Sequence, residues 1–229
     1  QPNAKGASVA ALHVKTGEAA WQALDDEQAY TTPMLVELDG RRQLLVVTAR
    51  RAAGLDPGSG ALLWSYPWKT DHGVNAAQPA VVEGHHLLLS AGYGHGAALI
   101  EVSCPESGCS ASLVWENKHL KSKFNSPVIW EGYAYGLDEG ILTCIDLAGG
   151  ARKWKGGRYG YGQIVLAQGN LVITGEDGEL ILVEASPASL KEISRFRALN
   201  GKTWNMPALA GGVLYVRNEK EMAAFRAGP

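Results

Sequence analysis

The stretch Gly136–Trp154, with the sequence GLDEGILTCIDLAGGARKW, decides the fold. It begins with a turn around Gly140, and the apolar run over residues 141–147 is typical of a β-strand. The Gly-Gly pair at 149–150 then supplies a hairpin turn, and a second strand follows that contains Trp154. We interpret this stretch as one repeat unit, which the rest of the chain copies.

The repeat can be followed as the pattern Gly-x-x-x-Trp. It occurs at Gly17–Trp21, Gly60–Trp64 and Gly150–Trp154, and Trp115 and Phe196 continue the spacing. Successive aromatic positions are separated by 43, 51, 39 and 42 residues, and the longest interval contains an insertion bounded by two cysteines. A period of about 42 residues is typical of four short strands with their turns.

A second pattern has the same period. A proline precedes an apolar segment and a glycine turn at Pro33, Pro79, Pro127 and Pro207, and residues 163–169 have the same form without proline. An apolar or alternating run follows each turn, so each repeat holds four strands. No segment has a sustained helical period.

These units predict an all-β fold, a β-propeller of four-stranded blades. We expect a single domain over residues 1–229 with about five blades. The blade repeats are approximately 1–24, 29–68, 75–117, 125–156, 163–198 and 205–229. Four are complete, whereas the N-terminal repeat supplies two strands and the C-terminal repeat three. Because an open propeller exposes sheet edges, we expect the termini to close a five-bladed ring or to complete blades across a homodimer, which would build a larger ring.

The composition is that of a globular chain with a core, with 46% hydrophobic residues, 19% charged residues and a net charge of -2. This charge argues against nucleic acid as a partner. No apolar run approaches the roughly 18 to 20 residues that span a bilayer, and no charged-then-apolar leader opens the chain. We therefore expect neither a membrane-spanning segment nor a signal peptide in this sequence.

The three cysteines give two expectations. Cys104 and Cys109 flank Pro-Glu-Ser-Gly and could close a small disulfide loop in an oxidising environment. They could instead form half of a metal site, but no second ligand pair has zinc-like spacing, so we favour the disulfide. Cys144 lies in an apolar run and is expected to be a small buried hydrophobe rather than a reactive thiol.

The Leu-Asp run, the Thr-Gly-type turn and the Gly-x-x-x-Trp pattern, alternating with Ser-Pro-apolar-Gly strands, resemble the pyrroloquinoline-quinone-like propeller repeat. This repeat is found in quinoprotein alcohol dehydrogenases and in the related outer-membrane assembly lipoprotein. The resemblance covers nearly the whole chain and implies that the tryptophans dock between neighbouring blades, a role for Trp21, Trp64, Trp115 and Trp154. Complete members have about eight blades, so the chain resembles the C-terminal portion of such a protein or a short relative.

The resemblance does not extend to the quinone site. Quinoprotein dehydrogenases hold their cofactor with a vicinal cysteine pair, a calcium site and a catalytic aspartate, and this chain has no adjacent cysteines. Acids on successive blades could converge on calcium, but exposed turn acids are the simpler interpretation of Asp138, Glu139, Glu176 and Asp177. We therefore expect no cofactor, neither pyrroloquinoline quinone nor calcium.

A binding site is expected at one mouth of the propeller channel, where the loops after the second and fourth strands of each blade meet. These loops carry cations, amides and aromatic residues, which suit a small polar or anionic ligand or a segment of another protein. The candidate ligand-binding residues are Arg50, Lys69, Tyr93, Lys123, Asn125, Arg158, Tyr159, Tyr161 and Trp204. The alternative is a solvated face without a site, although aromatic residues in glycine-rich turns expose flat faces for stacking.

Catalytic candidates are few. No nucleophile motif is present. Asp71 and His72 could supply an acid and a base within one loop, and His95 could face them from a neighbouring connection, although adjacent residues usually point apart. His85 and His86 lie on a turn into a strand and are expected to be edge or surface residues rather than metal ligands, so no metal site is predicted.

We therefore expect a ligand- or protein-binding scaffold module, bacterial and periplasmic or secreted, without an intact quinone site. The alternative is an enzyme with its site at the channel mouth. It would be either a hydrolase that uses histidine and acids or a degenerate quinoprotein oxidoreductase.

Overall fold

The structure, a computed structural model, describes residues 7–226. Within these residues it contains β-strands and turns, and no helix that is long and apolar enough to cross a membrane. The chain divides into two compact units, residues 1–89 with 98–115 and residues 90–97 with 116–229.

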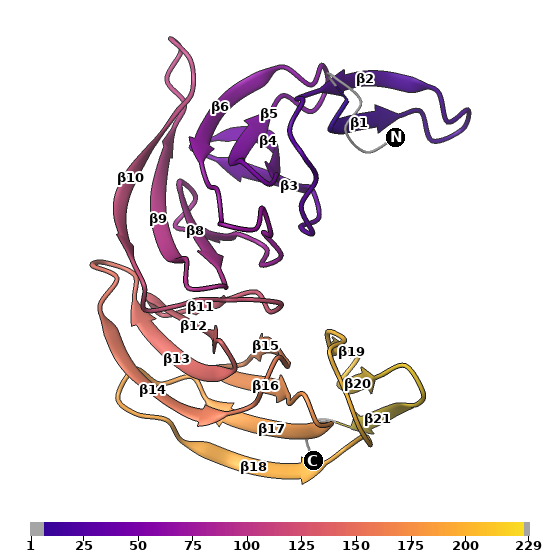
Figure 1. Ribbon diagram of the computed structural model, residues 1–229, viewed down its shortest axis with the longest axis vertical. Helices are drawn as coiled ribbons and strands as arrows, with labels where there is room; N and C mark the ends of the chain where they lie inside the picture. The colour runs from indigo at the N-terminus through magenta and orange to yellow at the C-terminus, as the bar shows by residue number, and fades with distance from the viewer. Residues whose placement is uncertain (1–6, 227–229) are drawn as a thin grey trace. The chain divides into compact units, whose positions relative to one another are not determined.

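The strands form six sheets in chain order (Figure 1). A two-stranded sheet comes first, four sheets of four strands follow, and a three-stranded sheet comes last. The bounds are β1 Val9–Leu12 and β2 Ala19–Ala23; β3 Met34–Leu38, β4 Arg41–Val47, β5 Arg51–Leu55 and β6 Leu62–Pro67; β7 Ala80–Val82, β8 His86–Ala91, β9 Gly96–Ser103 and β10 Ser110–Asn117; β11 Val128–Trp130, β12 Tyr133–Asp138, β13 Ile141–Asp146 and β14 Arg152–Arg158; β15 Gln163–Ala167, β16 Asn170–Thr174, β17 Glu179–Glu184 and β18 Glu192–Arg197; and β19 Ala208–Ala210, β20 Val213–Arg217 and β21 Met222–Arg226.

These sheets confirm the predicted blades. The four complete repeats each form one four-stranded sheet whose strands are neighbours in chain order, and the end repeats supply two and three strands. Closure of the ring, its completion by a second copy and the single-domain organisation stay predictions.

In three of the repeats, the tryptophan lies opposite a residue that is followed by a β-bulge. Trp21 pairs with Ala11, Trp64 with Gly54 and Trp154 with Cys144, and in each case the register shifts at the next residue of the partner strand. In the β17–β18 pair the same shift follows Leu182, which pairs with Ser194. Ser194 therefore holds the tryptophan position, and the expectation that Phe196 continues the pattern is wrong, because strand register and not sequence interval fixes the equivalence.

Two of the indoles bond to the sheet that follows them. Trp21 donates its Nε1–H to the carbonyl of Pro57 at 3.0 Å, and Trp154 donates to the carbonyl of Ser186 at 2.9 Å. Both acceptors lie in the turn between the third and fourth strands of the next sheet. Trp64 instead donates to Gln43 of its own sheet.

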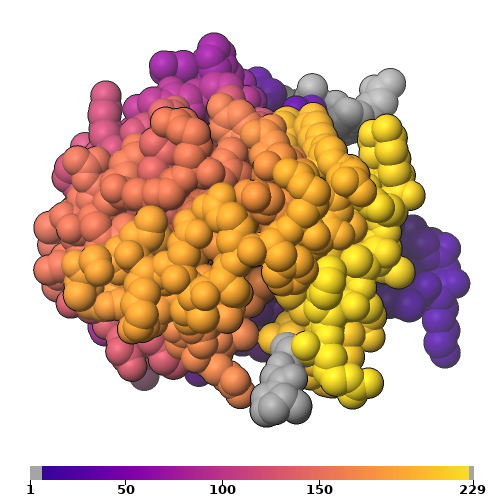
Figure 2. Space-filling model, turned by 90° about the horizontal axis from the view of Figure 1, so that it is seen from below, coloured from indigo at the N-terminus to yellow at the C-terminus, as the bar shows by residue number. Residues whose placement is uncertain are grey.

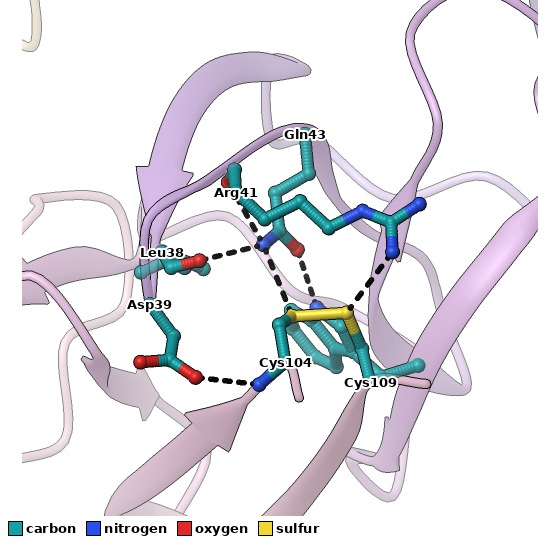
Figure 3. Close-up of a disulfide and its surroundings, with 7 residues drawn as sticks. Leu38, Asp39, Arg41, Gln43, Cys104 and Cys109 are labelled. Carbon is teal, nitrogen blue, oxygen red and sulfur yellow. Dashed lines mark hydrogen bonds between the residues drawn. A yellow bond between two sulfur atoms is a disulfide. The ribbon is translucent and has the colours of Figure 1, made fainter. Parts of the chain in front are cut away.

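Cys104 and Cys109 form a disulfide at the end of the β9–β10 hairpin, as their spacing predicts (Figure 3). The hairpin end is held against the turn between β3 and β4, because the backbone N–H of Cys104 donates to Oδ2 of Asp39 at 2.6 Å. The Gln43 amide nitrogen and Cys104 Sγ lie 4.0 Å apart, which completes a polar seam between these two sheets.

A core fills the space between the β11–β14 and β15–β18 sheets. Buried side chains from both sheets pack here, among them Tyr135, Leu142, Ile173 and Ile181. Cys144 belongs to this core and is fully buried, as expected. Its burial raises the pKa of the thiol to about 11, so the thiolate is disfavoured at neutral pH.

The β15–β18 and β19–β21 sheets lie side by side, as the orange and yellow surfaces of Figure 2 show. Leu180, Leu199, Leu214 and Val216 form the core between them. An apolar groove of about 310 Å³ opens beside this core and is lined by both Ser194 and Phe196. The position that carries an indole in other sheets thus faces an unfilled apolar surface here.

Candidate functional site

Four aromatic rings from four different loops gather in the second unit, and three of them contact one lysine. Tyr93 lies between β8 and β9, Phe124 follows Lys123 between β10 and β11, Tyr161 lies between β14 and β15, and Trp204 lies between β18 and β19. We call these five residues the aromatic platform.

The ammonium group of Lys123 lies against three of the rings. Its Nζ is 4.4 Å from the ring centroid of Tyr93, 4.7 Å from that of Tyr161 and 5.5 Å from that of Phe124. It is also 3.5 Å from the Tyr161 hydroxyl oxygen. A cation–π contact contributes about 0.5 to 1 kcal/mol at an exposed site, so the two tyrosines together hold the ammonium in place.

The rings also pack on one another. Phe124 stacks on Trp204 with centroids 5.1 Å apart, and Tyr161 meets both rings edge-on at 5.6 and 6.1 Å. Stacked and edge-to-face arrangements are the favourable ones for aromatic pairs. Tyr93 is 37% exposed and Trp204 is 36% exposed, so the platform presents large aromatic side chains to solvent.

One carboxylate joins two edges of the platform. Glu176 accepts the Trp204 indole N–H with Oε1 at 3.0 Å and the Tyr161 backbone N–H with Oε2 at 3.1 Å. A glycine is required at position 160, where φ is +64° and a Cβ would lie 2.4 Å from Glu176 Oε2. The Lys202 ammonium lies 3.4 Å from the ring centroid of Trp204.

A buried acid fixes the loop that carries Lys123. Asp138 is fully buried and accepts from the backbone N–H of Lys121 at 3.1 Å and from its ammonium at 2.9 Å. The Lys155 ammonium pairs with the other carboxylate oxygen. Gly92, which precedes Tyr93, approaches the Lys123 backbone so closely that a Cβ would lie 2.9 Å from its Cα. These contacts hold the backbone from which the Lys123 side chain extends.

Tyr93 occupies a backbone conformation that tyrosine disfavours. Its φ is +56° and that of the following Gly94 is +77°. Asn, Asp and Gly are the residues preferred at such positions of a tight turn, and a bulky residue there costs about 1 kcal/mol or more. Because the turn itself does not favour tyrosine, we infer that the Tyr93 side chain is the reason for this residue.

The structure thus brings together Tyr93, Lys123, Tyr161 and Trp204 from the predicted ligand-binding set. Two other residues of that set, Asn125 and Tyr159, are buried inside the fold. Both amide atoms of Asn125 bond to the backbone of Leu137, and Tyr159 is buried with its hydroxyl donating to Glu192 at 2.6 Å. Burial of Tyr159 also raises its pKa. Neither side chain offers a polar group to a ligand, so both are left out of the platform.

The remaining predicted residues lie elsewhere. Arg158 lines a shallow hollow on β13 and β14 with Arg152 and Lys155. In the first unit, Arg50 pairs with Glu27 at 2.9 Å and Lys69 is exposed. Their roles in binding stay predictions.

The catalytic candidates occupy loops of both units. Asp71 and His72 are exposed in the loop between β6 and β7 of the first unit. His95 follows Tyr93 in the second unit and donates its backbone N–H to Gly92 at 3.1 Å. Their catalytic roles stay predictions.

The acids considered for calcium each have a partner. The expectation that they are exposed is wrong for Asp138, which is buried between two lysines. Glu139 accepts the backbone N–H of Gly94 at 3.2 Å, and Asp177 lies 3.6 Å from Arg197. Glu176 is the acid that supports the platform.

Sequence reasoning missed Phe124 as a site residue and did not select Lys202. Their positions in the sequence could have indicated both residues, because Phe124 follows Lys123 in the same loop and Lys202 precedes Trp204 by two residues.

Comparison with known proteins places the sequence in a family. The family model described as Outer membrane protein assembly factor BamB matches residues 3–156. No curated protein matches the sequence.

Similar solved structures share the fold at low sequence identity. BamB from Moraxella catarrhalis is 15% identical with a TM-score of 0.52, over 93% of this chain and 76% of that chain. The computationally designed Ika8 protein is 10% identical with a TM-score of 0.62, over 98% and 79%. Sqt1 from Saccharomyces cerevisiae is 10% identical with a TM-score of 0.63, over 90% and 61%. Because the family model covers more than half of the sequence, and the blades agree with the quinone-type propeller repeat, the chain belongs to the BamB family of outer membrane protein assembly factors.

Proposed function

We propose that this chain is a protein-binding module in outer-membrane protein assembly and that the aromatic platform is its contact surface. The observation that carries the proposal is the convergence of four rings from four loops, three of which contact the ammonium of Lys123 while Trp204 stacks on Phe124. The family supports the kind of partner, since its description is that of an assembly factor for outer membrane proteins.

The platform favours a partner segment with apolar and acidic side chains. Tyrosine and tryptophan are enriched among the residues that dominate binding energy at protein interfaces. Lys123 and Lys202 face aromatic rings, and neither forms an ion pair with an acid among residues 7–226. A carboxylate of the partner would supply the missing counter-charge, while the rings would cover its apolar groups.

The location that we propose is the cell envelope, on the periplasmic side. The Cys104–Cys109 disulfide supports it, because disulfides persist in oxidising compartments. Tryptophan docking between blades belongs to the same proposal and is supported by the bonds of Trp21 and Trp154 to the next sheet. The proposal includes no quinone or calcium cofactor. Light scattering during size exclusion would distinguish the two expected arrangements, a five-bladed ring closed within one chain and a homodimer.

A binding measurement with paired variants tests the contact surface. The purified chain would be titrated against the immobilised outer-membrane assembly machinery of the same organism. We expect the double variant Lys123→Ala/Trp204→Ala to weaken binding at least tenfold, because interface residues of this kind contribute about 2 kcal/mol or more. The matched control is Lys15→Ala/Tyr30→Ala, since Lys15 and Tyr30 are exposed in the first unit. Equal losses in both double variants, or no loss in the first, would contradict the proposal.

A further inference from the structure

One hairpin of the first unit has an extra residue, and that residue is a histidine. Five hairpins join the first and second strands of the described sheets that have three or four strands. Four of them have two-residue loops, with paired ends Leu38 and Arg41, Trp130 and Tyr133, Ala167 and Asn170, and Ala210 and Val213. In the β7–β8 hairpin Val82 pairs with His86, so the loop holds Glu83, Gly84 and His85.

A backbone hydrogen bond next to the extra residue shows which residue of β9 lies opposite His86. The N–H of Val102 on β9 donates to the carbonyl of His85 at 2.8 Å. In the β11–β14 sheet the corresponding bond runs from Leu147 to Gly132, and there the next residues, Tyr133 and Asp146, are opposite each other. By the same offset Glu101 lies opposite His86, and side chains of opposite residues share one face of a sheet.

The three side chains meet on that face. The ligand atoms of His85, His86 and Glu101 all lie within 4.8 Å of one another. The two imidazole rings have centroids 4.1 Å apart. The histidines are half-buried and the glutamate is exposed, so the cluster is open to an ion from solvent.

The tautomer of His85 suits metal binding. Its Nδ1 lies 2.8 Å from the carbonyl oxygen of Glu83. A carbonyl oxygen only accepts, so Nδ1 carries the hydrogen and Nε2 has a free lone pair. Metal-ligating histidines bond in this way, with the other ring nitrogen donating to a carbonyl or carboxylate that fixes the ring.

We propose that His85, His86 and Glu101 bind Zn²⁺. Two imidazole nitrogens and one carboxylate oxygen form a donor set that zinc uses, with a fourth position for water or a side chain of another molecule. Ligand atoms around tetrahedral zinc lie about 3.3 Å apart at bond lengths of about 2 Å, so small side-chain rotations would close the cluster. The site uses no residue of the aromatic platform and does not depend on the proposed function.

A competition titration tests the site. Chelator-treated protein and a fluorescent zinc chelator would be titrated with Zn²⁺. We expect one zinc per chain and a loss of more than about a hundredfold in affinity for His85→Ala, because outer-shell changes alone cost 10- to 100-fold. Glu101→Gln should weaken binding at least tenfold. His13→Ala removes an exposed histidine outside the cluster and should leave affinity unchanged.

Deletion of His85 gives a second, structural variant. It restores the two-residue loop of the four other hairpins, so the chain should fold, with an unchanged circular dichroism spectrum, and should bind no zinc. Zinc affinity that is the same in wild type, His85→Ala and the deletion variant would overturn the proposal, as would a wild-type chain that takes up no stoichiometric zinc.

Discussion

The indole N–H of Trp204 donates to Glu176 across 3.0 Å and joins the β18–β19 loop to the turn between β16 and β17. The second oxygen of the same carboxylate accepts the backbone N–H of Tyr161. A single side chain therefore sets the positions of two rings of the aromatic platform.

Replacing this carboxylate should loosen the platform. We expect Glu176→Ala to cost about 1 kcal/mol of unfolding free energy, since hydrogen bonds to charged groups contribute about 1.5 to 3 kcal/mol and this one is partly exposed. Hydrogen exchange of the Tyr161 amide should accelerate. Glu176→Gln keeps a carbonyl acceptor and should change exchange less. Unaltered protection of that amide in the alanine variant would show that Glu176 does not hold the loop.

Tyr93 should separate stability from binding. In Tyr93→Asn the left-handed backbone is relieved and the cation–π contact with Lys123 is lost, and these effects are each about 1 kcal/mol. We therefore expect urea unfolding to change by less than about 1 kcal/mol while affinity for the assembly machinery falls severalfold. Undiminished affinity would remove Tyr93 from the contact surface.

Asp26 should make the first unit sensitive to acid. This buried carboxylate accepts two bonds of 2.7 Å from Arg51 and one of 2.9 Å from Thr48, and chiefly the Arg51 bonds lower its pKa. Because the folded state favours the charged form, the stabilisation is present above the unfolded pKa of about 3.9 and is lost as pH falls toward the folded value.

Asp26→Asn should therefore cost about 2 kcal/mol at pH 7, and its difference from wild type should shrink below about pH 4. Denaturant unfolding across this pH range measures the effect. The control is Asp25→Asn, an exposed neighbour 3.9 Å from Arg51, which should cost less than about 0.5 kcal/mol. A difference for Asp26→Asn that stays constant down to pH 3 would contradict the assignment.

Ser194→Trp should stabilise the second unit. The position corresponds to Trp154 by register and lines the apolar groove between the last two sheets. Burying an indole there should add about 1 kcal/mol and raise the Tm by about 2 to 4 °C, whereas Ser194→Ala should change little. A lower Tm for the tryptophan variant would show that the groove does not have the shape of the missing indole.

The blades were predictable because glycine turns, tryptophans and apolar runs repeat at a fixed interval. Tyr93, Lys123, Tyr161 and Trp204 could be selected because they fall in the loops after the second and fourth strands of a blade, which are expected to meet at one mouth of the channel. Side-chain direction could not be predicted. Asn125 has the sequence appearance of a surface amide, yet it is buried because its amide completes the backbone bonding of Leu137.

Strand register also could not be predicted from the sequence. Glu83-Gly84-His85-His86 resembles the turns of the other repeats, and only the pairing of Val82 with His86 shows that one residue is added. In the same way, the interval from Trp154 to Phe196 continues the repeat, and only the bulge after Leu182 assigns the tryptophan position to Ser194.

Photo-crosslinking from position 204 tests the central claim most directly. A photoreactive phenylalanine analogue would replace Trp204 in the native cell, with the same analogue at exposed Tyr30 as the control. If the aromatic platform is the contact surface, we expect a crosslink to a protein of the outer-membrane assembly machinery from position 204 and none from position 30. Equal crosslinking from both positions, or none from position 204, would contradict it.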